Sequence, residues 1–382
     1  MEKKEIETIQ ELIQVLEDGG DLRGYAIQGI AIDIVQDRLL AGGVTTEGAY
    51  FLGCPMTPYL RDELEARGAM IFPVMSDLPY NPYRPFLYSK EELYDKFDRQ
   101  KPESYLDCLD AVILKHWRAD GGPEPTNLIH AMAQRMHDQS IGNALSEFLE
   151  MMKVERRGVV AIMGGHDMLR SDPAYFNVAK IAWLLSRKGY LMVSGGGPGA
   201  MEATHVGAWF AGRTEAELVR AVTILSGAPL YKDELWLSLA YQVMEEYPHG
   251  EDSKHFSVGV PTWLYGHEPP TPFASHIAKY FANSLREDGL VTIGTAGIIY
   301  APGSAGTIQE IFQDVTQNHY LTTGRASAMV FYGSEYWTKI KPVYPLVKQL
   351  AQGKVYNTLL GLVDEIDDVV QWIENHPPLG EV

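Results

Sequence analysis

Two glycine-rich segments hold the residues whose types and spacing could bind an anion. Residues 194–199 read Ser-Gly-Gly-Gly-Pro-Gly, and residues 302–307 read Pro-Gly-Ser-Ala-Gly-Thr. Each segment follows a short apolar run and precedes a stretch with helical spacing. Glycine at a strand-to-helix turn lets backbone N–H groups approach a phosphate, and the helix dipole adds about half a positive charge there. One such turn can be a mere tight connection, but two in one domain favour a site for a phosphorylated ligand.

A glutamate follows each turn, and its spacing has two interpretations. Thr307 and Glu310 form a capping-box pattern, a structural device that explains both residues without any ligand. Alternatively, the Glu310 carboxylate faces the ligand crevice, where the nearby helix N-terminus favours its ionised form. There it could hold ribose hydroxyls, orient a water molecule or stabilise a positively charged sugar ring in the transition state. Glu202, one turn into the helix after the first glycine turn, is a second candidate of the same kind.

Neither turn matches the better-known phosphate-binding motifs. Neither fits the dinucleotide pattern G-x-G-x-x-G with its spaced acid, and neither ends in the Lys-Ser/Thr of a P-loop. NAD-dependent dehydrogenases and P-loop NTPases are therefore disfavoured. His166 and Asp167 follow an apolar run at the expected rim of the site. They could do acid–base work, although neighbouring side chains usually point apart.

Histidines and aromatic residues in the segment 236–267 have weaker claims to a function. His249, His255 and His267 show no recognised zinc spacing, so no metal site is expected. The aromatic residues could stack on a base, form a dimer contact or belong to the core. They are Trp236, Tyr241, Trp263 and Tyr265.

The elements that must position these residues alternate between strand and helix from Val159 onward. Predicted strands span 159–163, 191–194, 221–225, 256–260, 298–301, 329–332 and 361–363, and predicted helices span 173–188, 200–211, 273–285, 308–319, 343–352 and 365–375. Repeated strand–helix units imply a parallel sheet with helices on both faces, and ligands of such sheets lie at the carboxyl ends of the strands. The predicted fold is therefore a Rossmann-like, doubly wound α/β sheet.

The preceding part of the chain carries no motif with chemical content. Helical spacing over residues 6–16 stops at Gly19-Gly20, short strands are predicted at 25–34 and 49–52, and a long helix at 128–152. The proline- and tyrosine-rich stretch 73–85 predicts an ordered loop. A charged segment at 155–157 precedes the first predicted strand of the α/β part. We therefore expect an additional N-terminal α+β domain of unknown role at 1–153 and the Rossmann-like domain at 154–382.

Composition narrows the class of protein. The 382 residues carry a net charge of −18, which argues against a nucleic-acid surface and against binding to anionic membranes. Two cysteines are too few for a disulfide framework or a zinc cluster. Residues 1–6 are charged and lack an apolar signal-peptide core, and the longest uncharged apolar stretch, 290–301, is short of the ~20 residues of a spanning helix. We expect a cytoplasmic protein.

The two glycine segments together resemble the LOG family, once labelled "lysine decarboxylase-like". The family patterns are G-G-G-P-G-x-M-E-A, matched here by 195–203, and P-G-G-x-G-T-x-x-E, matched by 302–310 with Ser304 in place of the second glycine. The resemblance extends from about Val159 to Asn375 and includes Gly164-Gly165 after the first strand.

The resemblance implies a Rossmann-like fold and, in most members, a homodimer or higher homo-oligomer. Characterised members hydrolyse the N-glycosidic bond of nucleoside 5′-monophosphates to free base and ribose 5-phosphate, and plant members activate cytokinins in this way. No cofactor is expected, because the chain offers no convincing Schiff-base lysine context for pyridoxal phosphate. A non-catalytic protein that binds a nucleotide, or carries a phosphorylated pterin such as molybdenum cofactor, is the alternative.

The residues that the resemblance and the turns nominate fall into two groups. Glu310 matches the family's catalytic glutamate, and the candidates for nucleotide contact are Gly164, Gly165, His166, Gly195, Gly196, Gly197, Gly199, Met201, Glu202, Pro302, Gly303, Ser304, Ala305, Gly306 and Thr307. The family's catalytic arginine belongs to M-x-x-R-K on the helix before the second turn. The predicted helix 273–285 offers His276 and Lys279 there and has no arginine before Arg286. Lys279 is therefore the candidate for the positive charge, although it lacks the planar fork of arginine.

Overall fold

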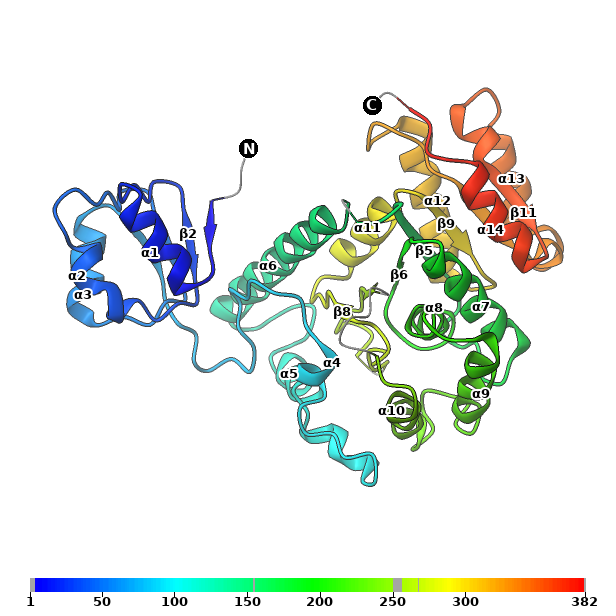
Figure 1. Cartoon of the computed structure of the whole chain (residues 1–382), viewed down its shortest axis with the longest axis horizontal. Helices are drawn as coiled ribbons and strands as arrows, with labels where there is room; N and C mark the ends of the chain where they lie inside the picture. Colours follow the sequence, from blue (N-terminus) through cyan, green and yellow to red (C-terminus); the bar gives the residue numbers. More distant parts are fainter. Residues whose placement is uncertain (1–3, 154, 250–255, 267, 381–382) are drawn as a thin grey trace. The chain divides into compact units, whose positions relative to one another are not determined.

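The computed structural model describes residues 4–153, 155–249, 256–266 and 268–380, which form two compact units (Figure 1). The first unit comprises 1–86 and 124–144, and the second comprises 87–123 and 145–382. Val154, at the domain boundary expected from the sequence, lies outside the described residues. The units do not divide the chain at a single point, because segment 87–123 packs with the C-terminal unit.

The C-terminal unit confirms the predicted Rossmann-like fold class. Seven strands among its described residues form one parallel sheet in the order β11-β10-β9-β5-β6-β7-β8. They are β5 Val159–Met163, β6 Leu191–Ser194, β7 Ser257–Gly259, β8 His276–Ile277, β9 Gly297–Tyr300, β10 Met329–Tyr332 and β11 Leu360–Val363. The chain runs outward from β5 to β8 and then returns to β9 on the other side of β5. This reversal between β5 and β9 is the place where ligands of open α/β sheets bind.

Helices cover both faces of this sheet (Figure 1). Helix α7 packs against α8, α9 and α14, while α11 packs against α12 and α12 against α13. The helices of the unit are α4 Lys90–Leu93, α5 Leu109–Ala119, α7 Pro173–Arg187, α8 Ala200–Trp209, α9 Glu215–Leu225, α10 Trp236–Glu246, α11 Asn283–Ile293, α12 Ala305–Tyr320, α13 Val343–Leu350 and α14 Ile366–Asn375. Shorter helical turns span Pro102–Asp107, Tyr336–Ile340 and Val355–Leu359. No helix among the described residues has both the length and the apolar character needed to cross a bilayer.

Two predicted elements of this unit are wrong. In each case hydrogen bonds that the sequence pattern did not reveal determine the local structure. The segment 221–225, predicted as a strand, is the end of α9. Thr214 and Glu217 cap that helix reciprocally, and Leu218, Ala221, Val222 and Leu225 are buried at helical spacing.

The helix expected at 273–285 is also wrong. His276 and Ile277 form β8, which pairs in parallel with Val258 and Gly259 of β7. The following amides of Ala278 and Tyr280 donate to the carbonyls of Gly259 and Pro261. Because sheet and loop partners take these N–H groups, the helix before the second glycine turn begins only at Asn283. This shift of one element changes which side chains reach the site.

The N-terminal unit holds its own four-stranded parallel sheet among its described residues, in the order β1-β2-β3-β4. The strands are β1 Glu5–Ile6, β2 Ala26–Gln28, β3 Tyr50–Leu52 and β4 Met70–Phe72, and the helices are α1 Ile9–Glu17, α2 Gln36–Leu39 and α3 Pro58–Ala66, with a 3-10 turn at Ile32–Val35. The predicted helix before Gly19 and the strand near 49–52 are confirmed, whereas β1, β4 and α3 had no counterpart in the prediction. The long helix expected at 128–152 is α6, Leu128–Lys153, and it is shared between the units.

Candidate functional site

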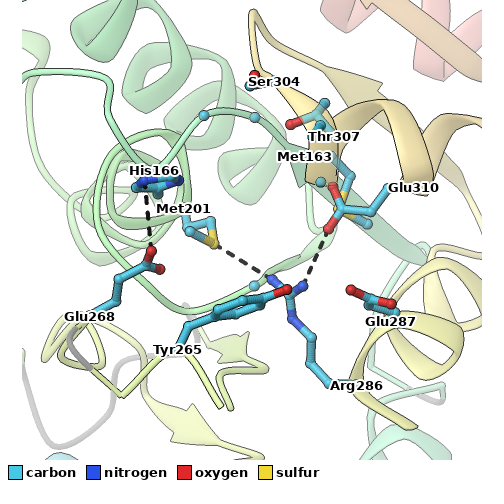
Figure 2. A pocket seen from close by; sticks show the side chains of 15 residues that line it. Met163, His166, Met201, Tyr265, Glu268, Arg286, Glu287, Ser304, Thr307 and Glu310 are labelled. Atoms are coloured by element: carbon cyan, nitrogen blue, oxygen red, sulfur yellow. Dashed lines mark hydrogen bonds and ion pairs between the residues drawn. The ribbon is translucent and has the colours of Figure 1, made fainter. Parts of the chain in front are cut away.

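A pocket of about 410 Å³ opens at the carboxyl ends of β5, β6 and β9, where the strand order reverses (Figure 2). It collects residues from the strand ends, from both glycine turns and from helices α8, α11 and α12. They are Met163, Gly164, Gly165, His166, Gly195, Met201, Tyr265, Glu268, Arg286, Glu287, Ser304, Ala305, Gly306, Thr307 and Glu310. The structure thus brings together much of what the sequence nominated, including the candidate acid.

The second glycine turn presents the N-terminus of α12 to this pocket. The helix begins at Ala305, after Ser304 in the N-cap position, and no side chain among the described residues caps it. Ala305, Gly306 and Thr307 are therefore the first three helical residues, whose N–H groups have no partner inside the helix. The capping-box interpretation of Thr307 and Glu310 is wrong, because Thr307 lies inside the helix instead of preceding it. Three uncapped amides at a helix start form a ready site for an anion.

Two side chains that the sequence did not nominate hold this turn from behind. The Lys341 Nζ donates to the Ser304 Oγ at 2.9 Å and to the Gly303 carbonyl at 3.2 Å. The Tyr336 hydroxyl donates to the same carbonyl. Gly303 itself is required, because a Cβ there would lie 2.1 Å from the Thr307 Oγ1. A turn fastened in this way keeps its amides directed at the pocket and adds one positive charge beside them.

The first glycine turn is closed by the protein itself. The Ala200 N–H, the first of helix α8, donates to the Gly165 carbonyl at 3.1 Å. The Gly196 N–H donates to the Ser194 hydroxyl at 3.2 Å. Gly199 has φ +71°, and a Cβ on it would lie 2.3 Å from the Gly165 carbonyl oxygen. Only Gly195 and, from α8, Met201 reach the pocket from this motif, while Gly196, Gly197 and Gly199 do not line it.

Glu310 and Arg286 face each other inside the pocket (Figure 2). The Arg286 Nη1 lies 3.6 Å from the Glu310 Oε1, and both residues are less than a tenth exposed. The Arg286 Nε donates to the Val260 carbonyl at 3.2 Å, which fixes the guanidinium plane. The pair therefore places a planar cation and a carboxyl group within reach of one bound molecule.

Burial determines the protonation of Glu310. It raises the pKa of Glu310 to about 7, an effect that the Arg286 guanidinium partly opposes and the Glu287 carboxylate increases. The expectation of an ionised carboxyl rests on the helix N-terminus alone, which favours the ionised form, whereas burial of the side chain acts in the opposite direction. A carboxyl group with a pKa near neutrality can act as an acid or as a base at physiological pH.

Arg286 is the functional candidate that sequence reasoning placed outside the site. The sequence pattern predicts the cation on a helix at 273–285. The helix that precedes the second turn is instead α11, with Arg286 in its first turn. The sequence spacing could have indicated this position, because Arg286 precedes Leu290 by four residues and Leu290 is fully buried on the same helix. An arginine at that spacing lies on the inner side of the helix.

Lys279 and Glu202 lie outside this pocket, each in a buried ion pair. The Lys279 ammonium bonds to the Asp110 carboxylate and lies 4.9 Å from the centre of the Trp263 ring. Burial lowers the pKa of Lys279, and Asp110 opposes that change. Glu202 accepts hydrogen bonds of 2.8 Å from the Arg170 Nε and from the Tyr175 hydroxyl. The geometry gives both residues a packing role; the catalytic role expected for Lys279 has no support from its position.

The outer wall of the pocket comes from the loop between β7 and β8. Tyr265 and Glu268 of this loop line the pocket, and His166, from the segment after β5, places its Nε2 3.8 Å from the Glu268 Oε1. Of the four aromatic residues nominated in this region, Tyr265 reaches the pocket and is 41% exposed, whereas Trp236 and Trp263 are buried elsewhere and Tyr241 packs against Phe97. The His249 ring packs against Trp209, and His255 and His267 lie outside the described residues.

Comparisons with known proteins add the following findings. No protein-family model matches the chain, and no curated protein matches it. Similar solved structures include the molybdenum cofactor carrier protein from Chlamydomonas reinhardtii, at 12% identity and a TM-score of 0.37, covering 58% of this chain and 98% of that one. Another is the molybdenum cofactor binding protein from the phototrophic bacterium Rippkaea orientalis, at 12% identity and a TM-score of 0.35, covering 58% of this chain and 97% of that one. With likeness at this level, the function has to be argued from the pocket itself.

Proposed function

We propose that the pocket binds a small phosphorylated molecule of the nucleoside 5′-monophosphate class. The observation that carries this proposal is the uncapped N-terminus of α12, which opens into a pocket that also contains Arg286 and Glu310. The phosphate accepts hydrogen bonds from the amides of Ala305, Gly306 and Thr307, with Lys341 behind the turn. This arrangement needs no basic surface, which is consistent with a chain whose net charge is −18.

The remaining groups suit the rest of such a ligand. With the phosphate at α12, the sugar lies toward Glu310, one and a half turns along the same helix, and Arg286. The Tyr265 ring and the Glu268 carboxylate lie on the wall of the loop between β7 and β8. An aromatic face can stack on a base, and a carboxylate can accept its N–H groups. The pocket volume of about 410 Å³ falls within the range of small-molecule sites.

Hydrolysis of the N-glycosidic bond is the second candidate function, favoured by the pKa of about 7 for Glu310. In this reaction the bond between C1′ and the base nitrogen breaks, the oxygen of a water molecule bonds to C1′, and the base leaves with a proton. As a carboxylate, Glu310 accepts the proton of the attacking water and stabilises the positive charge of the sugar ring. The resemblance of the second turn to the LOG family supports this candidate.

Binding without reaction is the competing function. A carrier would hold its ligand by the same amides and release it intact, and a phosphorylated pterin such as molybdenum cofactor presents the same anionic group to α12. The Arg286–Glu310 pair would then stabilise the pocket without reacting. The two functions share the phosphate site and differ only in the fate of the ligand.

One experiment separates these outcomes. The protein is incubated with AMP, GMP, CMP and UMP while ribose 5-phosphate is measured, and thermal unfolding is followed with each nucleotide and with isolated molybdenum cofactor. Release of ribose 5-phosphate supports hydrolysis. Stabilisation by a ligand that stays intact supports a carrier, since a ligand at a hundred times its Kd adds about 2.7 kcal/mol. If no ribose 5-phosphate is released and no ligand stabilises the protein, the proposed site is contradicted.

Variants link either outcome to the pocket. Glu310→Gln is expected to reduce hydrolysis by about 10²- to 10⁴-fold while the nucleotide still raises the melting temperature. Arg286→Met is expected to reduce both hydrolysis and binding. Glu335→Gln is the matched control, because this glutamate is exposed at the surface and outside the pocket. Equal activity of the Glu310→Gln variant and the wild type would exclude the proposed chemistry.

A further inference from the structure

A second cavity of about 470 Å³ lies at the amino ends of the central strands of the same sheet, where β5 and β6 begin. Its walls come from the ends of α6 and α11, the strand starts and the segments at Arg325 and Pro378. On helix α11, Arg286 lines the first pocket and Ile293 lines this cavity, and the rise of 1.5 Å per residue places them about 10 Å apart along the helix axis. The cavity is therefore separate from the pocket proposed above.

The charged side chains that line this cavity are mostly positive. Lys153, Arg156, Arg157 and Arg325 line it, against a single acidic residue, Glu150, among the described lining residues. The C-termini of α6 and α11 add roughly half a negative charge each, which balances about one of the four cations. Four basic side chains therefore line one cavity in a chain whose net charge is −18.

Arg156 stands out within this group. Its Nε and Nη2 atoms are buried and have no hydrogen-bond partner among the described residues. The Phe256 ring lies 5.6 Å from its guanidinium carbon, and burial lowers the pKa of Arg156. Buried N–H groups of a cation without acceptors are costly, so a protein seldom leaves them unmatched. An acceptor brought by a ligand would remove that cost.

The neighbouring cations differ in whether they already form an ion pair within the protein. The Arg157 Nη1 lies 3.0 Å from the Glu374 carboxylate, and Lys153 pairs with Glu150. Arg325 is exposed, and no ion pair is found for it among the described residues. Arg156 and Arg325 are therefore the cations of this lining for which no ion pair is found among the described residues, although the Glu155 carboxylate attracts Arg156 and partly opposes the effect of burial on its pKa.

We propose that this cavity is a second ligand site, which binds a small polyanion carrying phosphate groups through Arg156 and Arg325. Guanidinium groups match phosphate oxygens with paired N–H donors, and such charge-assisted bonds are the stronger class of hydrogen bond. A cavity of this volume accommodates a molecule of the size of a nucleotide. The site is independent of the function proposed for the first pocket and would remain if that function were wrong.

Anion binding at the first pocket has to be prevented in this experiment, because the α12 amides would bind the same probe. Gly306→Glu does this: a Cβ at Gly306 meets nothing within 4 Å, and the added carboxylate repels an anion at the start of α12. Inorganic pyrophosphate is then titrated calorimetrically into the Gly306→Glu protein. Binding that weakens as ionic strength rises is expected.

Three further variants in the Gly306→Glu background decide the result. Arg156→Gln and Arg325→Gln are each expected to weaken pyrophosphate binding by about tenfold or more. Arg220→Gln is the matched control, since Arg220 lies on α9 away from the cavity and should leave the affinity unchanged. Arg325 is exposed, so its replacement tests the site even where Arg156→Gln disturbs folding. Absence of pyrophosphate binding in the Gly306→Glu protein, or unchanged affinity in both arginine variants, would overturn the proposal.

Discussion

The two glycine turns of the C-terminal unit have similar sequences, but their helix-start amides and their glutamates have different surroundings. Each follows a buried strand, each starts a helix, and each is followed by a buried glutamate. At the first turn the helix-start amide of Ala200 donates to Gly165, and Glu202 is neutralised by Arg170. Neither α8 nor α12 has a side-chain cap among the described residues, but at the second turn no acceptor is found there for the Ala305 N–H, and Glu310 faces a pocket.

The difference shows that a glycine turn can offer its amides to an anion only where the rest of the fold leaves those donors unused. The first turn uses its glycines for close packing of β6, α8 and the segment after β5. The second turn is supported from behind by Tyr336 and Lys341, so that its amides remain directed at the pocket. One motif therefore stabilises the fold and the other is available for a ligand, and each can be tested by the same kinds of substitution.

The largest expected effect is the loss of stability on replacing Glu202. Glu202→Gln leaves the buried Arg170 without its charge partner, and breaking a buried ion pair costs about 3–5 kcal/mol. Denaturant unfolding measures this loss. Arg170→Met combined with Glu202→Gln should recover part of it, because the unpaired charge is then removed as well. A Glu202→Gln protein as stable as the wild type would show that this acid is not the structural counterpart of Glu310.

A smaller loss is expected from a methyl group at the first turn. Gly199→Ala places a Cβ 2.3 Å from the Gly165 carbonyl oxygen at a residue with φ +71°. Backbone strain and displacement of that carbonyl are expected to cost about 3 kcal/mol together. Thermal unfolding of Gly199→Ala tests this. An unchanged melting temperature would mean that the first turn is open, as the second is.

The pH dependence of stability should distinguish Glu310 from a paired carboxylate. Its pKa is raised to about 7 in the folded protein, so the folded state holds a proton that the unfolded chain releases near pH 4.5. The contribution of Glu310 protonation to the free energy of unfolding is fully present below pH 4.5 and is lost as the pH rises through 7. Relative to the wild type, Glu310→Gln should therefore gain up to about 3 kcal/mol between pH 4.5 and 8. Comparing the two proteins by denaturant unfolding across this range isolates Glu310, and a flat difference would contradict the raised pKa.

The smallest expected effect on stability is a methyl group at the second turn. Gly306 is helical and a Cβ there meets nothing within 4 Å, so Gly306→Ala should leave the stability unchanged or raise it by up to about 1 kcal/mol. The methyl group lies at the pocket wall, so nucleotide binding in the thermal-shift assay should weaken. A Gly306→Ala protein destabilised as much as Gly199→Ala would remove the contrast between the turns.

Much of the C-terminal fold could be predicted because its signals are local. Continuous apolar runs mark β5, β6 and β10, whose predicted and observed bounds coincide, and turn glycines mark their ends. The errors fall where long-range contacts decide. Residues 273–281 have an apolar, helix-like pattern, yet the pairing of His276 with Val258 draws them into the sheet. That error alone moved the expected cation from Arg286 to Lys279.

The sequence by itself determined that two glycine turns follow parallel strands and that an acid stands on the helix after each. Tertiary structure decided which turn keeps its amides available, which cation meets Glu310 and how far burial raises the pKa of that acid. The physical reason is the range of the interactions. Turn geometry and periodicity depend on neighbouring residues, whereas hydrogen-bond partners, ion pairs and hydration depend on groups brought together from distant parts of the chain.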